Sequence, residues 1–334
     1  MNRLEEFDRR WEKKNLGLFH ADPRYREPQP SYDPCLWKWE DMEEALKEAS
    51  EIVSAEEAFR RTIAFRNPST KRGATHTLLM SCQTVLPGEI APAHRHTMTA
   101  TRFVIKGGGA QTTIEGEPFP LERGDFVTTP SRTWHDHYNG SSEPIIWLDG
   151  ADGPLIRLLE IGFSEPYGAK QQECTKPSGG SLYELAPARP SWVSPDPIQP
   201  PPYRYRWEDT EKALKALGEK PGDPCDGLLL KFVNPLTGGP TLPTISCEIQ
   251  MLRPKEVTKS HRHTSSAIYH VFSGKGFTSI GDQRYEWKNG DTFALPLWRW
   301  HHHGSRSGEG AILFAMNDRP VMEKLGFYRE EEHS

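Results

Sequence analysis

The stretch His94-Arg95-His96-Thr97 occurs a second time in this 334-residue chain, as His261-Arg262-His263-Thr264. Residues on both sides of these two stretches also match, at a nearly constant shift of about 166 to 168 positions. The matching segments are Trp39-Glu40-Asp41 with Trp207-Glu208-Asp209, Asn67-Pro68 with Asn234-Pro235, Gly124-Asp125 with Gly290-Asp291, Pro130 with Pro296, Trp134-His135 with Trp300-His301, Asp152 with Asp318, and Pro154 with Pro320. Self-similarity of this kind indicates one structural unit present twice, here named copy 1 and copy 2.

Each copy has the sequence pattern of a β-barrel that follows a short helix. The helix is predicted over 39–52 and again over 207–217, where Leu and Ala recur at helical spacing among Glu and Lys. Short β-branched or aromatic runs, separated by Gly, Pro and Asp, follow in copy 1 at 77–86, 100–105, 110–114, 126–129 and 145–148. Strands at this spacing are typical of an all-β barrel or sandwich, and we predict two β-barrels in tandem.

The domain boundaries follow from composition. Residues 165–202 are rich in Pro, Ser and Gly, which cannot form a helix or a central strand, so we expect a linker there. We expect residues 1–35 to form an N-terminal arm, with its Pro-rich part, 21–34, extended over the surface. The first barrel domain is then 36–164 and the second is 203–334.

Composition and charge exclude several classes of function. The net charge is −5, and no basic stripe is present that would bind nucleic acid. The N-terminus is too charged for a signal peptide, and no run of about 18 apolar residues suggests a membrane span. The five cysteines are odd in number and form no Cys-X-X-Cys motif, which indicates reduced thiols. We therefore expect a cytoplasmic protein with no nucleic acid and no membrane as partner.

The repeated histidines have the spacing of metal ligands. His94 and His96 lie at positions i and i+2, so on a strand both project from one face. His135 follows a Gly-Asp turn and a further strand, and can return across a small barrel to join them. Three neutral imidazoles leave coordination positions open, which is a catalytic arrangement. We name His94, His96 and His135 triad 1; an isolated His-X-His would more simply be read as surface or hydrogen-bonding histidines.

The residues around triad 1 resemble the paired signature of the cupin superfamily. Gly88 stands six positions before His94, the turn 107–109 is all glycine, and Gly124 and Pro130 precede His135, with Asn139 four beyond it. The resemblance implies two tandem cupin domains, each a double-stranded β-helix of the jelly-roll type. Cupins usually have an acidic fourth ligand shortly after the His-X-His pair, but residues 97–102 contain none, which implies a three-histidine site.

The longer motifs look like those of gentisate 1,2-dioxygenase and its relatives that act on salicylate and 1-hydroxy-2-naphthoate. They are Ala91-Pro92-Ala93-His94-Arg95-His96-Thr97, Arg102-Phe103-Val104-Ile105 and Thr133-Trp134-His135-Asp136-His137. The resemblance covers nearly the whole chain. It implies an Fe(II)-dependent, extradiol-type oxidoreductase that uses O₂ to cleave an aromatic 2-hydroxy acid between the carbons bearing the carboxylate and the hydroxyl, giving maleylpyruvate from gentisate. It also implies a homotetramer.

Several residues are candidates to bind such a substrate. A 2-hydroxybenzoate chelates iron through its carboxylate and phenolate, and a nearby fixed cation would favour the carboxylate, so we assign Arg102 to the substrate. The resemblance adds Arg61, in the pair Arg60-Arg61, and Gln83 as substrate contacts, although the register of the arginine pair is open. It also places His137 and Asp149 in the pocket, and we expect Asp149 to hold His137 in one tautomer. A solvated arginine and a turn aspartate are the simpler alternatives.

Copy 2 retains the histidines but not their charged neighbours. The counterparts of triad 1 are His261, His263 and His301, here named triad 2, which could hold a second metal. The other counterparts are Tyr269 for Arg102, Ala315 for Asp149, Gly227-Leu228 for Arg60-Arg61, Gln250 for Gln83 and His303 for His137. We therefore predict that copy 1 is catalytic. A non-catalytic bicupin that binds a small anion remains an alternative, whereas oxalate decarboxylases and sugar isomerases generally keep the acidic ligand that is missing here.

Overall fold

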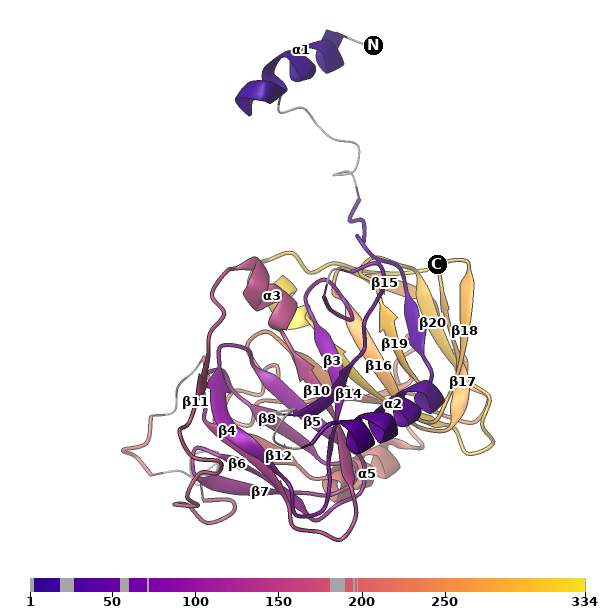
Figure 1. Cartoon of the computed structure of the whole chain (residues 1–334). Coiled ribbons are helices and arrows are strands. Elements are labelled where there is room, and N and C mark those ends of the chain that lie inside the picture. The colour runs from indigo at the N-terminus through magenta and orange to yellow at the C-terminus, as the bar shows by residue number, and fades with distance from the viewer. Residues whose placement is uncertain are drawn as a thin grey trace.

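The computed structural model describes residues 3–18, 27–54, 60–70, 72–180, 190–194, 196 and 198–333. Within these residues the chain forms four antiparallel sheets and a few short helices, and each copy contributes one barrel (Figure 1). The prediction of two tandem all-β barrels with short flanking helices is confirmed.

Copy 1 is built from a six-stranded sheet, named sheet 1, and a five-stranded sheet, named sheet 3. Sheet 1 has the order β12 (Tyr203–Tyr205), β8 (Phe126–Thr129), β5 (Ala100–Lys106), β10 (Ile145–Ala151), β3 (Leu79–Val85) and β2 (Arg61–Ala64). Sheet 3 has the order β11 (Ser164–Pro166), β4 (Ile90–His96), β9 (His135–Asn139), β6 (Ala110–Ile114) and β7 (Glu117–Leu121).

Copy 2 repeats this arrangement with sheets 2 and 4. Sheet 2 has the order β1 (Cys35–Trp37), β19 (Thr292–Leu295), β16 (Ala267–Ser273), β21 (Ala311–Asn317), β14 (Ser246–Leu252) and β13 (Leu228–Phe232). Sheet 4 has the order β18 (Gln283–Lys288), β17 (Lys275–Ile280), β20 (His301–Ser305), β15 (His261–His263) and β22 (Glu330–Glu332).

The central strands of the six-stranded sheets are buried on both faces, and the alternation of side chains separates two environments. On β3, Met80 and Cys82 lie in the apolar core shared by the two copies, whereas Val85 packs inside barrel 1. Phe103 of sheet 1 stacks on Phe314 of sheet 2, with ring centroids 4.3 Å apart. Sheets 1 and 2 therefore pack against each other, and their opposite faces line the two barrels.

The first strand of each copy joins the sheet of the other copy. β1 pairs with β19, so Cys35 lies opposite Ala294, and β12 pairs with β8, so Tyr203 lies opposite Thr128. The sequence predicts domains at 36–164 and 203–334, and each of these strands lies at the start of one range but pairs with a strand of the other. The exchange has a physical reason, since each added strand covers an edge that would otherwise expose unpaired backbone groups.

The helix after each exchanged strand is capped by an aspartate of the opposite copy. α2 (Trp39–Ile52) begins where the Trp39 amide donates to Asp291 Oδ1 at 3.0 Å, and α5 (Trp207–Leu217) begins where the Trp207 amide donates to Asp125 Oδ1 at 2.8 Å. Glycine precedes each aspartate because the tryptophan ring leaves no room for a side chain: a Cβ at Gly124 would lie 2.5 Å from Trp207 Cγ. The two predicted helices are confirmed, and the repeated Gly-Asp pairs join the copies.

The remaining elements lie at the edges. α3 (Gly153–Leu158) follows β10 and α6 (Arg319–Lys324) follows β21. α1 (Arg3–Trp11), followed by a 3₁₀ turn (Glu12–Lys14), buries none of its residues. Part of the expected linker packs on copy 1, since β11 pairs with β4 and the Gln172 amide donates to Asp136 at 2.9 Å. The Pro-rich stretch 21–34 lies partly outside the described residues. None of the described helices is long and apolar enough to span a bilayer, and all five cysteines are free thiols.

Candidate functional site

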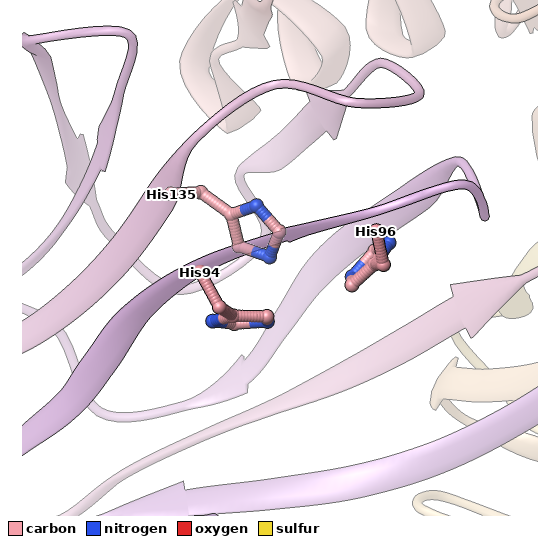
Figure 2. Close-up of side chains that lie close together, drawn as sticks. All are labelled: His94, His96 and His135. Carbon is pink, nitrogen blue, oxygen red and sulfur yellow. The ribbon is translucent and has the colours of Figure 1, made fainter. Parts of the chain in front are cut away.

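Triad 1 is assembled by two neighbouring strands of barrel 1. His94 and His96 lie on β4, and His135 begins β9, directly opposite His94 in the register of the two strands. The three rings converge (Figure 2), and one ring nitrogen from each lies within 4.8 Å of the others. The structure thus brings together the three histidines that the sequence pattern selected.

Backbone carbonyl groups orient the three rings. The Nδ1 atoms of His94, His96 and His135 lie 2.8, 2.8 and 3.0 Å from the carbonyl oxygens of the residues Pro92, Met98 and Thr133. With Nδ1–H donating to a carbonyl, each Nε2 keeps its lone pair for a metal ion, which is the usual arrangement around metal-bound histidines.

Burial keeps the triad in the neutral form that binds metal. Desolvation first, and the nearby Arg60 second, lower the pKa of His94 to about 3 and that of His96 to about 4. For His135 desolvation and then Arg102 hold the pKa well below its usual value. The rings are unprotonated at neutral pH, so the residues fit a divalent transition metal of borderline softness.

Arg60, and not Arg61, points toward triad 1. The Arg60 Nη2 atom lies 3.3 Å from His135 Nε2 and also contacts the His94 ring. Arg61 instead pairs with Glu89, with Nη1 to Oε2 at 2.5 Å, and its Nε donates to the Val53 carbonyl at 2.8 Å. Successive residues of an extended chain project to opposite sides, so of the pair Arg60-Arg61, whose register the sequence leaves open, Arg60 is the one that faces triad 1.

Arg102 is a fully buried cation beside the triad. Its Nε lies 3.3 Å from Asp149 Oδ1, because Asp149 on β10 stands opposite Arg102 on β5. Nη1 donates to the hydroxyl of Thr129, while Nη2 has no hydrogen-bond partner among the described residues. Burial raises the pKa of Asp149, and the two arginines, Arg102 and Arg60, oppose that shift.

His137 lies in the same pocket, but its partner differs from the one expected. Its Nδ1 lies 2.8 Å from the Thr112 hydroxyl, and Thr112 on β6 stands opposite His137 on β9. The expectation that Asp149 fixes the His137 tautomer is therefore corrected: Asp149 pairs with Arg102, and Thr112 holds the imidazole. Sequence reasoning missed Thr112 and Thr129, since only the strand register reveals them.

Gln83 completes a group of buried polar atoms that the described residues leave unpaired. Both atoms of its side-chain amide lack partners, as does His137 Nε2. Buried polar groups are nearly always hydrogen-bonded, so a set of them beside three metal-ligating rings indicates a site for a polar ligand.

Triad 2 has almost the same geometry in different surroundings. One nitrogen from each of His261, His263 and His301 again lies within 4.8 Å of the others. Tyr269 and Ala315 face each other across β16 and β21, as Arg102 and Asp149 do across β5 and β10. The cation of copy 1 is therefore replaced by a phenol, and the carboxylate by a methyl group.

Comparisons with known proteins agree with this architecture. The chain matches the Cupin_2 family, described as a cupin domain, at residues 81–150 and 248–317. It is similar to a salicylate 1,2-dioxygenase from Pseudoaminobacter salicylatoxidans whose structure contains gentisate adducts, with a TM-score of 0.87 and 28% identity, over 100% of this chain and 95% of that one.

Two curated relatives are closer in sequence. The first is a gentisate 1,2 dioxygenase 1 from Aquipseudomonas alcaligenes, 41% identical over 92% of this chain and 89% of the relative. The second is a 1-hydroxy-2-naphthoate 1,2-dioxygenase from Nocardioides sp. (strain KP7), 38% identical over 98% of this chain and 87% of the relative. With the duplicated cupin fold and triad 1 in place, these likenesses show that the chain belongs to the gentisate 1,2-dioxygenase family of bicupin oxidoreductases.

Proposed function

We propose that copy 1 is an Fe(II)-dependent ring-cleaving dioxygenase that converts gentisate and O₂ to maleylpyruvate. The observation that carries the proposal is the pair of arginines, Arg60 and Arg102, close enough to triad 1 to lower the pKa of its histidines. Two cations beside three neutral ligands suit an anionic substrate that chelates a metal. Both oxygen atoms of O₂ enter the product when the ring bond between the carboxylate-bearing and hydroxyl-bearing carbons breaks.

The bound metal and the protein residues have separate tasks. Fe(II), held by triad 1, would supply coordination positions for the substrate carboxylate, the substrate phenolate and O₂, together with the path by which electrons pass from the ring to oxygen. The residues described below bind the substrate, orient it and handle its proton.

Arg102 is the residue best placed to fix the substrate carboxylate. Thr129 accepts a hydrogen bond from Nη1 and Asp149 forms an ion pair beside Nε, while Nη2 has no hydrogen-bond partner among the described residues and can donate to an incoming oxygen. A guanidinium that is already oriented loses little freedom when it binds a carboxylate, so the interaction also sets the orientation of the ring.

Arg60 and Gln83 bind the remaining polar atoms of the substrate in this proposal. The guanidinium of Arg60 now lies among the ligand atoms of triad 1, and a metal ion there requires the side chain to turn aside. In its new position it remains next to the substrate, while the Gln83 amide can both donate and accept.

His137 accepts the proton of the substrate hydroxyl in this proposal. Burial holds its pKa well below the usual value, with the neighbouring arginines as the next causes, so the ring is neutral. With Nδ1–H donating to Thr112, Nε2 carries the free lone pair inside the pocket.

The test is anaerobic reconstitution with Fe(II), followed by measurement of oxygen uptake and ring-fission absorbance with gentisate, salicylate and 1-hydroxy-2-naphthoate. We expect the highest kcat/KM with gentisate. A preference for salicylate or the naphthoate would keep the reaction and change the substrate. Failure of all three while Fe(II) remains bound would favour the non-catalytic bicupin that binds a small anion.

We also propose, from the family resemblance, that the protein is a homotetramer in the cytoplasm. Light scattering coupled to gel filtration measures the assembly, and a monomer or dimer at micromolar concentration would contradict it.

A further inference from the structure

Triad 2 retains a complete set of metal-ligating rings although Arg102 and Asp149 are replaced by Tyr269 and Ala315. The ring centroids of His261 and His301 are 4.1 Å apart, compared with 4.3 Å for His94 and His135. Nδ1 of His263 and of His301 lies 2.8 and 2.9 Å from a backbone carbonyl, and His301 Nε2 is buried without a hydrogen-bond partner among the described residues. The Nε2 lone pairs of His263 and His301 are therefore oriented as those of triad 1.

A carboxylate approaches triad 2 from the segment that delivers Arg60 in copy 1. Arg60 stands just before β2, and Asp226 stands two residues before β13, the equivalent strand of sheet 2. Asp226 Oδ1 lies 3.9 Å from His261 Nε2. Two ligands of one ion, each bound at about 2.1 Å, lie at most about 4.2 Å apart, so both atoms can reach the same ion.

The loop that carries Asp226 is fixed in place. The Asp226 amide donates to Asp223 Oδ1 at 3.1 Å, and its carbonyl accepts from Gln250 Nε2 at 2.9 Å. Gln250 is the counterpart of Gln83. In copy 2 this glutamine holds the loop, whereas in copy 1 neither polar atom of the Gln83 amide has a hydrogen-bond partner among the residues that the structure describes.

The charges around the two triads are opposite. Copy 1 places Arg60 and Arg102 beside its triad, and Arg102 lies next to the carboxylate of Asp149. The cavity at triad 2 is lined by the acidic residues Asp226, Glu248 and Glu330 and by the basic residues Lys231 and Arg319. Arg319 is paired with Glu323 at 2.6 Å, and Lys231 stands opposite Glu248 in the sheet. Both basic residues thus have a carboxylate beside them, and the carboxylate that approaches the histidines is Asp226, which favours a cation over an anionic aromatic acid.

We propose that triad 2 and Asp226 bind a divalent transition-metal ion at a site that takes no aromatic acid. Three imidazoles and one carboxylate are nitrogen and oxygen donors of the kind that bind divalent transition metals in proteins. Tyr269 and Ala315 stand where copy 1 has Arg102 and Asp149, so copy 2 has no guanidinium at the position that would fix an aromatic carboxylate. Copy 1 thus lacks the acidic fourth ligand, and copy 2 takes it from a loop instead of from the segment after the His-X-His pair.

The test uses Co²⁺ as the probe on the full-length chain after removal of metal with a chelator. Gel filtration followed by elemental analysis gives the metal content, and the visible spectrum reports coordination. We expect two equivalents of Co²⁺ in the wild type, one in His96→Ala, and none when His263→Ala is added. In the His96→Ala protein, Asp226→Asn should weaken Co²⁺ binding at least about tenfold and change the spectrum.

His302→Ala is the matched control. His302 lies between His301 and His303, yet its ring faces Phe277, at 5.9 Å between centroids, so this variant should retain the second equivalent. The proposal would be overturned if folded His96→Ala protein bound no Co²⁺. It would also be overturned if His302→Ala lost as much metal as His263→Ala. Asp226→Asn preserves side-chain shape, so it tests the fourth ligand even if His263→Ala does not fold; an unchanged affinity and spectrum would exclude Asp226.

Discussion

Triad 1 and triad 2 have nearly the same ring geometry but opposite electrostatic surroundings. In both, two histidines come from one strand, the third comes from its neighbour, and one nitrogen of each ring lies within 4.8 Å of the others. Arginine approaches triad 1 and aspartate approaches triad 2. The three histidines are thus kept in both copies, whereas the charged residues next to them differ.

The largest effect should separate the two triads in catalysis. We expect His96→Ala to lower ring cleavage by about 10³-fold or more, because the metal is lost. His263→Ala should keep most of the activity, since its site lies in the other barrel. Oxygen uptake with gentisate measures both. Equal losses in the two variants would mean that the assignment of catalysis to copy 1 is wrong.

His137→Gln should lower kcat by about 10²-fold, the usual scale for loss of a general base. The counterpart His303 makes a similar bond to Thr278, at 2.9 Å, so His303→Gln is the matched control and should leave kcat unchanged. Steady-state kinetics on iron-loaded protein gives the comparison. A similar fall in both would indicate a packing role for these histidines.

The pH dependence of stability should differ at one more pair of counterparts, His270 of copy 2 and Phe103 of copy 1. Burial, with Arg123 as the second cause, lowers the pKa of His270 to about 3. The unfolded chain binds a proton near pH 6.5 and the folded chain does not, so this contribution to stability is present above pH 6.5 and is lost as the pH falls toward 3.

From pH 7 to pH 5 the loss from His270 should be about 2 kcal/mol in the free energy of unfolding. Urea titration of metal-free wild type and His270→Phe at the two pH values tests this. The variant should show a correspondingly smaller loss, and an identical pH dependence in both proteins would refute the assignment.

Arg102→Lys should raise KM about tenfold, about 1.4 kcal/mol, while iron stays bound. A lysine keeps the positive charge next to Asp149. It lacks the planar guanidinium that contacts Asp149 and Thr129 and, in the proposal, donates to the substrate carboxylate. Tyr269→Phe, at the equivalent position of copy 2, is the control and should leave KM unchanged. Loss of iron from Arg102→Lys would contradict the assigned role.

The smallest expected effect is on the free energy of unfolding, and it should be equal for the two aspartates that cap α5 and α2. Asp125→Asn and Asp291→Asn each weaken a helix cap and an ion pair, with Arg204 at 2.5 Å and with Lys38 at 2.8 Å respectively. Each should cost about 1 kcal/mol of unfolding free energy, without change in metal content. Thermal denaturation measures the pair, and a large difference between them would show that the copies depend on the exchange unequally.

The fold and triad 1 could be predicted from sequence because they rest on local spacing. The repeat of His94-Arg95-His96-Thr97 places two ligands on one strand, and the barrel pattern around it supplies the third. The contacts of the pocket could not be predicted so well. The choice between Arg60 and Arg61 depends on a single residue of register, and the bond from His137 to Thr112 depends on which strands pair.

Long-range features were missed for the same reason. Asp226 is adjacent to no motif, and it reaches triad 2 only because its loop folds back over the barrel. The exchange of β1 and β12 is invisible to periodicity, since short strands read alike whichever sheet they join.

The exchange of first strands means that the enzyme cannot be shortened to copy 1 alone. Deleting residues 203–334 would remove β12 from the edge of sheet 1 and expose Phe103 and Phe126, which are packed against copy 2. The orphaned β1 would have no sheet to join. Copy 2 would therefore be retained through evolution as an obligatory folding partner of copy 1, whatever its own metal contributes.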